Sequence, residues 1–290
     1  MTVMPKSQPN PYITLGLLAI IWGSSFILMK EGLKFYSSYQ IAAMRISFSG
    51  LALIPFVNWK KLDIKRSDYK YFIISGFLGS AIPAFLFPLA QTRISSSLAG
   101  AINGLTPLFA LIVGVIFLGV KFSRLKAFGV IFGLVGAVFL IIGQDVQFEF
   151  SHVMMAIVAT LCYGINVNII KQKLDSYPPL LVAALPLAII SIAGFAVLGY
   201  LGLNINVNDM QFIYSFSATL LLAFIGTSIS LIMFNRLIQQ TNTVFATSVT
   251  YLIPIVALFW GLFDHEQILY NHFIGLVFIL GAIWMIRKDK

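Results

Sequence analysis

The chain has 290 residues, of which 59% are hydrophobic and only 10% are charged. Soluble domains carry about 25% charged residues, and a chain of this size cannot hide so much apolar surface from water. Composition therefore excludes a water-soluble protein and indicates a polytopic membrane protein. The formal net charge is +9, but the basic residues lie in short loops between apolar runs, where they orient a membrane protein rather than bind nucleic acid.

Ten apolar runs are long enough to cross the hydrocarbon core, which takes about 20 helical residues. In chain order the expected spans are 12–31, 39–57, 71–90, 97–118, 124–142, 152–171, 180–200, 212–235, 243–263 and 269–286. The first run is expected to be a retained span, because it lacks a signal-peptide cleavage motif and similar runs follow it. The expected fold class is an all-α polytopic membrane protein with ten transmembrane helices and no separate soluble domain.

Lysine and arginine are distributed unevenly along this series of spans. Fifteen of the 19 fall in segments that would share one side with the N-terminus, and three fall at the opposite ends of spans. Because basic residues accumulate in cytoplasmic loops, this asymmetry predicts that both termini lie in the cytoplasm. The remaining one, Arg45, lies within the second span, about 10 Å from its outer end. It either anchors that helix through backbone carbonyls or pairs with a substrate carboxylate.

The two halves of the chain repeat each other. With a shift of 147 positions, "GFLGSAIPAFLFPLA" from Gly76 aligns with "AFIGTSISLIMFNRL" from Ala223, and ten of 39 positions are identical over residues 76–114. The predicted units are two five-helix repeats, residues 1–145 and 146–290. Because five is an odd number, the second repeat must be inverted in the membrane relative to the first. Inverted repeats are typical of alternating-access carriers, which bind substrate between the repeats.

Several short motifs, in this order, resemble the EamA-like, ten-helix members of the drug/metabolite transporter superfamily. They are "WGSSF" (22–26), Arg45 in "AAMRISF" (42–48), and the paired "LTPL" (105–108) and "LIPI" (252–255). The resemblance covers essentially the whole chain. It implies an exporter or exchanger of amino acids or other small metabolites. Where that family often has Gly-Glu at the end of the fourth span, this chain has Gly119-Val120, whereas the second repeat keeps Glu266.

Polar and aromatic side chains within the spans are the candidates for a substrate cavity. They are Trp22, Ser24, Ser25, Asn103, Thr106, Tyr163, Asn166, Thr227, Ser230, Thr250 and Tyr251. Small polar residues also mediate helix packing in lipid, so packing remains an alternative role for each hydroxyl. The amides of Asn103 and Asn166 are expected in a cavity wall, because an amide has four hydrogen-bonding sites and rarely faces lipid.

Two matched prolines and one acidic–histidine pair are further candidates. Pro107 and Pro254 are expected to form a hinge or gate, since a proline within a helix frees a backbone carbonyl and kinks the helix; a simple bend is the alternative. His265 and Glu266 are candidates for an external gate or proton relay, with a solvated loop as the alternative. The spans show no clustered nucleophile, metal-ligand set or phosphate-binding loop, so we expect neither catalysis nor a cofactor.

The charges expected within the membrane narrow the substrate class. No carboxylate is placed at mid-membrane and Arg45 is the only cation there, which disfavours polyvalent cationic drugs and phosphorylated sugars. The prediction is a secondary transporter that exports small neutral or zwitterionic metabolites, above all amino acids, across the inner membrane by alternating access. A broad-specificity drug or toxic-compound efflux carrier is the alternative within this class. A structural membrane protein or a membrane-embedded enzyme is the alternative outside it.

The expected partners follow from the predicted membrane fold and transport function. They are a small-molecule substrate and the lipid bilayer, without nucleic acid, and the protein is expected to be a monomer or a weak homodimer.

Overall fold

The computed structural model describes residues 10–59, 62–94, 96–119, 123–139, 149–263 and 270–288. Within these ranges the chain is helical and contains no strands. Its first half comprises α1 (Pro11–Gly32), α2 (Ser38–Leu53), η1 (Ile54–Phe56), α3 (Tyr69–Gly76), η3 (Phe77–Ala81), α4 (Ile82–Ala90), α5 (Ser96–Asn103), α6 (Thr106–Leu118) and α7 (Arg124–Phe139). Its second half comprises α8 (Phe150–Ile169), η4 (Ile170–Leu174), α9 (Pro179–Leu201), α10 (Met210–Ala223), η5 (Phe224–Ile229), α11 (Ser230–Gln240), α12 (Thr243–Thr247), α13 (Val249–Phe263) and α14 (Tyr270–Lys288).

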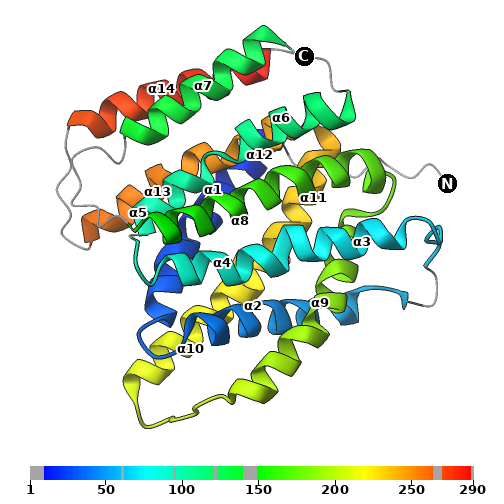
Figure 1. Ribbon diagram of the computed structural model, residues 1–290, viewed down its shortest axis with the longest axis vertical. Coiled ribbons are helices and arrows are strands. Elements are labelled where there is room, and N and C mark those ends of the chain that lie inside the picture. The colour runs from blue at the N-terminus through cyan, green and yellow to red at the C-terminus, as the bar shows by residue number, and fades with distance from the viewer. Residues whose placement is uncertain are drawn as a thin grey trace.

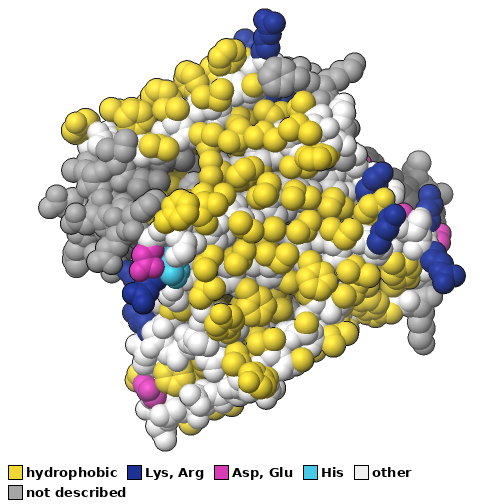
Figure 2. Space-filling model, viewed as in Figure 1, with side chains coloured by type: hydrophobic (Ala, Val, Ile, Leu, Met, Phe, Trp, Pro, Cys, Tyr) yellow, Lys and Arg dark blue, Asp and Glu magenta, His cyan; other side chains and the backbone are white. Residues whose placement is uncertain are grey.

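These elements form ten helical segments that correspond to the ten expected spans. Six are long and apolar enough to cross a membrane alone: Pro11–Gly32, Tyr69–Ala90, Leu98–Phe117, Phe150–Leu174, Pro179–Leu201 and Met210–Gln240. Apolar side chains cover the face seen in Figure 2, whereas lysine and arginine lie toward its edges. Large side chains such as Phe117 and Ile192 are about three-quarters exposed. Helices that present apolar surface between charged edges are those of a multi-pass membrane protein.

Local sequence accounts for where several helices begin and end. Asn10 caps α1 by accepting a hydrogen bond from the Tyr12 amide at 2.9 Å, and Pro11 occupies the first turn. Ser37 and Gln40 form a reciprocal capping box at the start of α2. Gly119 ends α6 with a φ of 63°, a left-handed conformation that glycine adopts at no steric cost.

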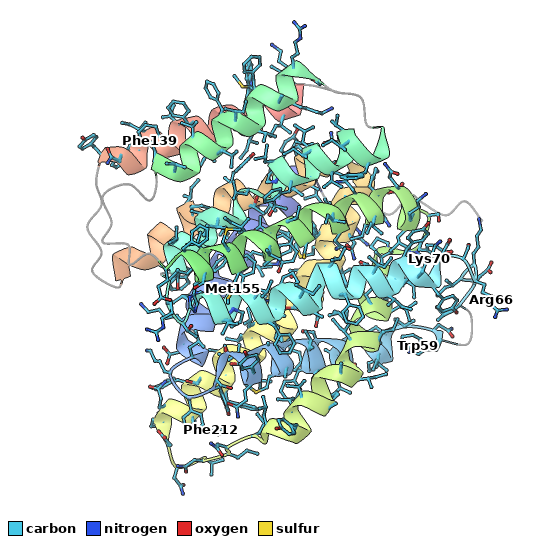
Figure 3. The ribbon with its side chains drawn as sticks, in the orientation of Figure 1. Trp59, Arg66, Lys70, Phe139, Met155 and Phe212 are labelled. Atoms are coloured by element: carbon cyan, nitrogen blue, oxygen red, sulfur yellow. The ribbon has the colours of Figure 1, made fainter. Side chains whose placement is uncertain are left out.

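Corresponding spans of the two halves run in opposite directions. Figure 3 places Lys70, at the start of α3, at one edge of the molecule and Phe212, at the start of α10, toward the other. A π-helix interrupts each of these two spans at the same repeat position, beginning at Phe77 in one and at Phe224 in the other. Contacts between the halves are matched too: α1 packs on α13 as α8 packs on α6, and α2 packs on its counterpart α9. The fold is therefore a pair of inverted repeats.

The contacts of two glycines show this relation in detail. A β-carbon added to Gly23 of α1 would lie 2.5 Å from Cβ of Val256, and one added to Gly164 of α8 would lie 2.6 Å from Cβ of Phe109. Gly23 aligns with Gly164 when "WGSSFILMK" (22–30) is placed on "YGINVNIIK" (163–171), a shift of 141 in the first span of each repeat, and Phe109 aligns with Val256 at the shift of 147. The same helix crossing thus occurs twice, and each depends on a residue without a side chain.

The fourth and ninth spans are both broken, but not at the same place. The fourth is interrupted at Gly104 and Leu105, and Pro107 is the second residue of α6, where its missing N–H leaves no intrahelical bond unmade. The ninth is interrupted at Ser248, and Pro254 lies within α13, where it leaves the Thr250 carbonyl without its helical donor. The matched prolines therefore act differently on their helices, and a hinge or gate at either stays a prediction.

Helices α7 and α14 form a separate pair at one end of the molecule (Figure 1). Gly136 makes this contact close, because a β-carbon there would lie 2.8 Å from the carbonyl oxygen of Gly275. The other eight spans form the body of the protein, and the pocket described next lies among them.

Candidate functional site

A pocket lies between the two repeats, with an empty volume of about 890 Å³ that includes space open to solvent. The helices α1, α2, η3, α4, α5 and α6 line it from the first half, and α8, η4, η5, α11 and α13 line it from the second. The lining residues of the described chain include none from α7, α9 or α14. A volume of this order suits a small organic ligand.

Nine of the residues predicted from sequence come together around this pocket. They are Trp22, Ser25, Arg45, Asn103, Thr106, Tyr163, Asn166, Thr227 and Thr250. They derive from seven helical elements that are far apart in sequence, so the fold gathers the polar residues of both repeats at one place. That they contact a substrate stays a prediction.

Arg45 is the one charged residue among the described residues that line the pocket. Its Nε donates a hydrogen bond to Oγ1 of Thr227 at 2.8 Å, and Arg45 also interacts with the hydroxyl of Tyr163. Thr227 in turn donates to the carbonyl oxygen of Leu222 at 3.0 Å. Arg45 on α2 is thus held against two elements of the second repeat, and a fixed guanidinium is suited to bind a carboxylate through two parallel hydrogen bonds.

Two aromatic pairs contribute to the walls at corresponding positions of the repeats. Trp22 meets Phe234 edge to face, with ring centroids 4.9 Å apart, and Tyr163 stacks on Phe87 at 6.1 Å. Trp22 aligns with Tyr163 and Phe87 with Phe234 in the two repeats. Because α4 and α11 belong to inverted repeats and run in opposite directions, the two pairs are related by the inversion of the repeats.

Trp22 also ties α1 to the π-helix η5. Its indole Nε1 donates to the carbonyl oxygen of Gly226 at 3.1 Å and to Oγ of Ser230 at 3.0 Å. A π-helix disturbs the regular ladder of backbone hydrogen bonds, and side chains of neighbouring helices can satisfy the carbonyls it frees. Ser230 thus contacts Trp22, which lines the pocket, and is not itself among the lining residues.

The structure also places Ser24 and Tyr251 away from the pocket. Ser24 Oγ accepts a hydrogen bond from Trp260 Nε1 at 2.8 Å, so it faces α13. Tyr251 is fully buried, its ring lies against Gly133, and its hydroxyl donates to the Val130 carbonyl oxygen at 3.1 Å. Both residues join helices, because neighbouring positions on a helix point in directions about 100° apart and only some of them face the pocket.

Most hydroxyls around the pocket donate to backbone carbonyl oxygens of their own span. Ser25 donates to the Ile21 carbonyl oxygen at 2.9 Å, Thr106 to that of Asn103 at 2.7 Å and Thr250 to that of Thr247 at 2.9 Å. These bonds are compatible with burial in lipid.

Two amides differ from these hydroxyls. The Oδ1 atoms of Asn166 and Asn235 are buried and have no hydrogen-bond partner, although the two residues are only 7% and 2% exposed. Both residues line the pocket. A buried acceptor without a partner costs about 1–3 kcal/mol, so a donor that enters the pocket, whether water or a solute, would stabilise these two oxygens.

Sequence reasoning missed Asn235. It lies on the same stripe of the eighth span as Thr227 and Leu231, at intervals of four residues, and that periodicity was the available signal. His265 and Glu266 lie outside the described residues. In the part of the chain that the structure describes, no group of three histidine, cysteine or acidic residues could hold a metal ion.

Inverted helical repeats with a pocket at their interface are typical of the folds of secondary transporters. The sequence model of the EamA-like transporter family matches two segments of this chain, residues 10–142 and 150–288. The chain therefore belongs to the EamA-like transporter family. Each match falls within one of the two predicted repeats, although the boundary at residue 145 stays a prediction.

Individual relatives agree with this assignment. The chain is 23% identical over 292 residues to "Uncharacterized transporter YoaV" of Bacillus subtilis (strain 168), covering 94% of this chain and 96% of that one. It is 25% identical to "Uncharacterized inner membrane transporter YedA" of Escherichia coli (strain K12), covering 84% and 79%. A match at 26% identity to an "Uncharacterized transporter" of Archaeoglobus fulgidus spans 58% of this chain and 60% of the archaeal one.

A solved structure, titled "Crystal structure of protein", shares the fold. Its TM-score is 0.75 at 13% sequence identity, and the comparison covers 98% of this chain and all of that one. The family and the names of the relatives point to a transporter rather than an enzyme.

Proposed function

We propose that this protein is a secondary transporter of the cell (inner) membrane that exports small neutral or zwitterionic metabolites, foremost amino acids. The observation that carries the proposal is the charge of the pocket: Arg45 lines it, and no carboxylate does among the described residues. A site of this kind favours a solute with a carboxylate and disfavours organic cations, which need a buried acid. The apolar remainder of the lining suits the carbon skeleton of the solute.

Alternating access is the proposed mechanism. The aromatic pairs Trp22–Phe234 and Tyr163–Phe87 lie at corresponding positions of inverted repeats, and each would close the pocket toward one face of the membrane. Because the repeats are related by symmetry, exchanging their conformations closes one pair and opens the other. In this proposal both termini lie in the cytoplasm, as the distribution of lysine and arginine indicates.

Proteoliposomes preloaded with a mixture of the twenty proteinogenic amino acids test the proposal. We expect release of a subset of them by the wild-type protein, and at least about a tenfold slower release by Arg45→Gln, since a charge-assisted, two-point contact with the carboxylate is lost. Arg93→Gln is the matched control, because Arg93 lies exposed in a loop, where its Nη1 is 3.9 Å from Oε1 of Glu149. Absence of release of every amino acid by the wild-type protein refutes the proposal.

A further inference from the structure

Asn235 is the feature of the pocket that the proposed function leaves unused. Its Oδ1 is buried without a hydrogen-bond partner, the residue is 2% exposed, and it lines the same pocket as Arg45. An acceptor in this position needs a donor from elsewhere. A solute that enters the pocket can supply it.

The position of Asn235 along its helix separates it from the charged end of the pocket. Thr227, which accepts the hydrogen bond from Arg45, lies eight residues earlier in the same span. At 1.5 Å per residue the two positions are about 12 Å apart along the axis. An ammonium group next to a carboxylate bound at Arg45 cannot reach so far, so Asn235 contacts another part of the solute.

Asn166 is placed for that ammonium group instead. It lies one helical turn beyond Tyr163, the residue that interacts with Arg45, and its Oδ1 also has no partner. Helices α8 and α10–α11 run in the same direction, since Met155 and Phe212, near their starts, lie toward the same edge of the molecule (Figure 3). Along that direction Asn166 therefore comes first and Asn235 later.

Between these polar positions the wall is apolar. Leu231 lies midway between Thr227 and Asn235 on the helix, and Ile170 and Phe234 line the same region. A solute that reaches from Arg45 to Asn235 therefore passes along an apolar wall, as an amino acid with an extended, largely apolar side chain would.

We infer that the pocket selects amino acids whose largely apolar side chain ends in an N–H donor, and that Asn235 is the residue that recognises this donor. The inference rests on the proposed function and narrows it. The carboxylate binds Arg45, the ammonium group binds Asn166, and the distal N–H binds Asn235. An amino acid of equal size without that N–H leaves the Asn235 acceptor unsatisfied, which is the strongest form of discrimination a buried polar site offers.

Two matched pairs of amino acids test the inference in proteoliposomes: tryptophan against 1-methyltryptophan, and glutamine against methionine. Wild-type protein is expected to release the donor-bearing member of each pair at least about ten times faster. The Asn235→Leu variant is expected to bring both ratios to about one. Equal release within both pairs by the wild-type protein, or a preference that survives in Asn235→Leu, overturns the inference.

Ser47→Ala is the matched control. Ser47 Oγ is also buried without a partner, but it lies against Gly194 between α2 and α9, outside the pocket. Its removal is expected to leave both ratios unchanged. A change as large as that of Asn235→Leu would show that the ratios respond to any lost buried polar group, and would overturn the assignment of Asn235.

A second variant keeps the inference testable if Asn235→Leu does not fold. Asn235→Asp is nearly isosteric and adds a negative charge at the distal position, so release of lysine relative to glutamine should rise at least about tenfold. An unchanged ratio overturns the inference. Absence of release of all amino acids by the wild-type protein refutes the proposed function as well, whereas equal release within the pairs refutes the inference alone.

Discussion

At the scale of single residues, Tyr177 and Asp68 join two segments at the end of the bundle where Lys70 and Arg66 lie (Figure 3). The Tyr177 hydroxyl donates to Oδ2 of Asp68 at 2.7 Å and accepts from the backbone amide of Lys65 at 3.2 Å. The hydrogen bond from Tyr177, followed by that from Ser67, lowers the pKa of the Asp68 carboxyl below its ordinary value. The ionised form is therefore the one that holds this contact together.

The contact should make stability depend on pH. Because the pKa of Asp68 is lower in the folded protein than in the unfolded chain, its stabilising effect is complete above the ordinary carboxyl pKa and is lost as pH falls through the lowered value. We expect Tyr177→Phe, which keeps the ring on Phe72, to reduce the loss of thermal stability between about pH 5 and pH 3 in detergent. Equal losses of thermal stability over this pH range in the wild-type and variant proteins would contradict this account. Lys65 and Lys173 are the nearby cations that also lower the pKa of Asp68.

Residue type and spacing selected nine residues that line the pocket and three that do not, Ser24, Ser230 and Tyr251, for an identifiable reason. Asn166 stands out in the sequence because an amide is costly in lipid, and Arg45 because it is charged. Ser24 and Tyr251 have the same chemistry as pocket residues but point toward other helices, as their bonds with Trp260 and Val130 show. The direction of a side chain depends on how the helices are rotated in the bundle, and a single sequence does not contain that information.

At the scale of helices, the spans were predictable to within a few residues because lipid imposes length and apolarity. The interruptions within these helices were not predictable. The π-helices η3 and η5 begin in runs that read as continuous apolar helix, and the break at Ser248 does not coincide with Pro254. Such irregularities depend on contacts with neighbouring helices, as Trp22 with the Gly226 carbonyl illustrates.

The glycine crossings give a prediction at this scale. Gly164→Ala should destabilise the protein by about 1–3 kcal/mol, because the new methyl group would press on the Phe109 backbone and Cβ, and Gly23→Ala should act similarly on Val256. Gly16→Ala in α1 is the matched control, since a β-carbon there would have nothing within 4 Å. Thermal unfolding of the purified variants in detergent measures the effect. Equal stability of the Gly16 and Gly164 variants would contradict the close crossing.

At the scale of the whole molecule, the repeats are symmetric in architecture and asymmetric in chemistry. Ser25 of the first repeat corresponds to Asn166 of the second, and Pro88 corresponds to Asn235. The unsatisfied amides of the pocket therefore come from the second repeat, whereas Arg45 comes from the first. Duplication accounts for the two matched aromatic pairs, and the difference between matched positions makes the lining of the pocket asymmetric, as the proposed recognition of an asymmetric solute requires.

Cysteine labelling tests most directly whether this pocket is the transport route. In a Cys162→Ala background, Ser25→Cys and Asn166→Cys place a thiol at corresponding positions of the two repeats, and Ser47→Cys places one between α2 and α9 outside the pocket. We predict that a membrane-impermeant thiol reagent labels both pocket positions, that a transported amino acid slows this labelling, and that Ser47→Cys remains unlabelled. Labelling of Ser47→Cys at the same rate, or unlabelled thiols at both pocket positions, would contradict the account.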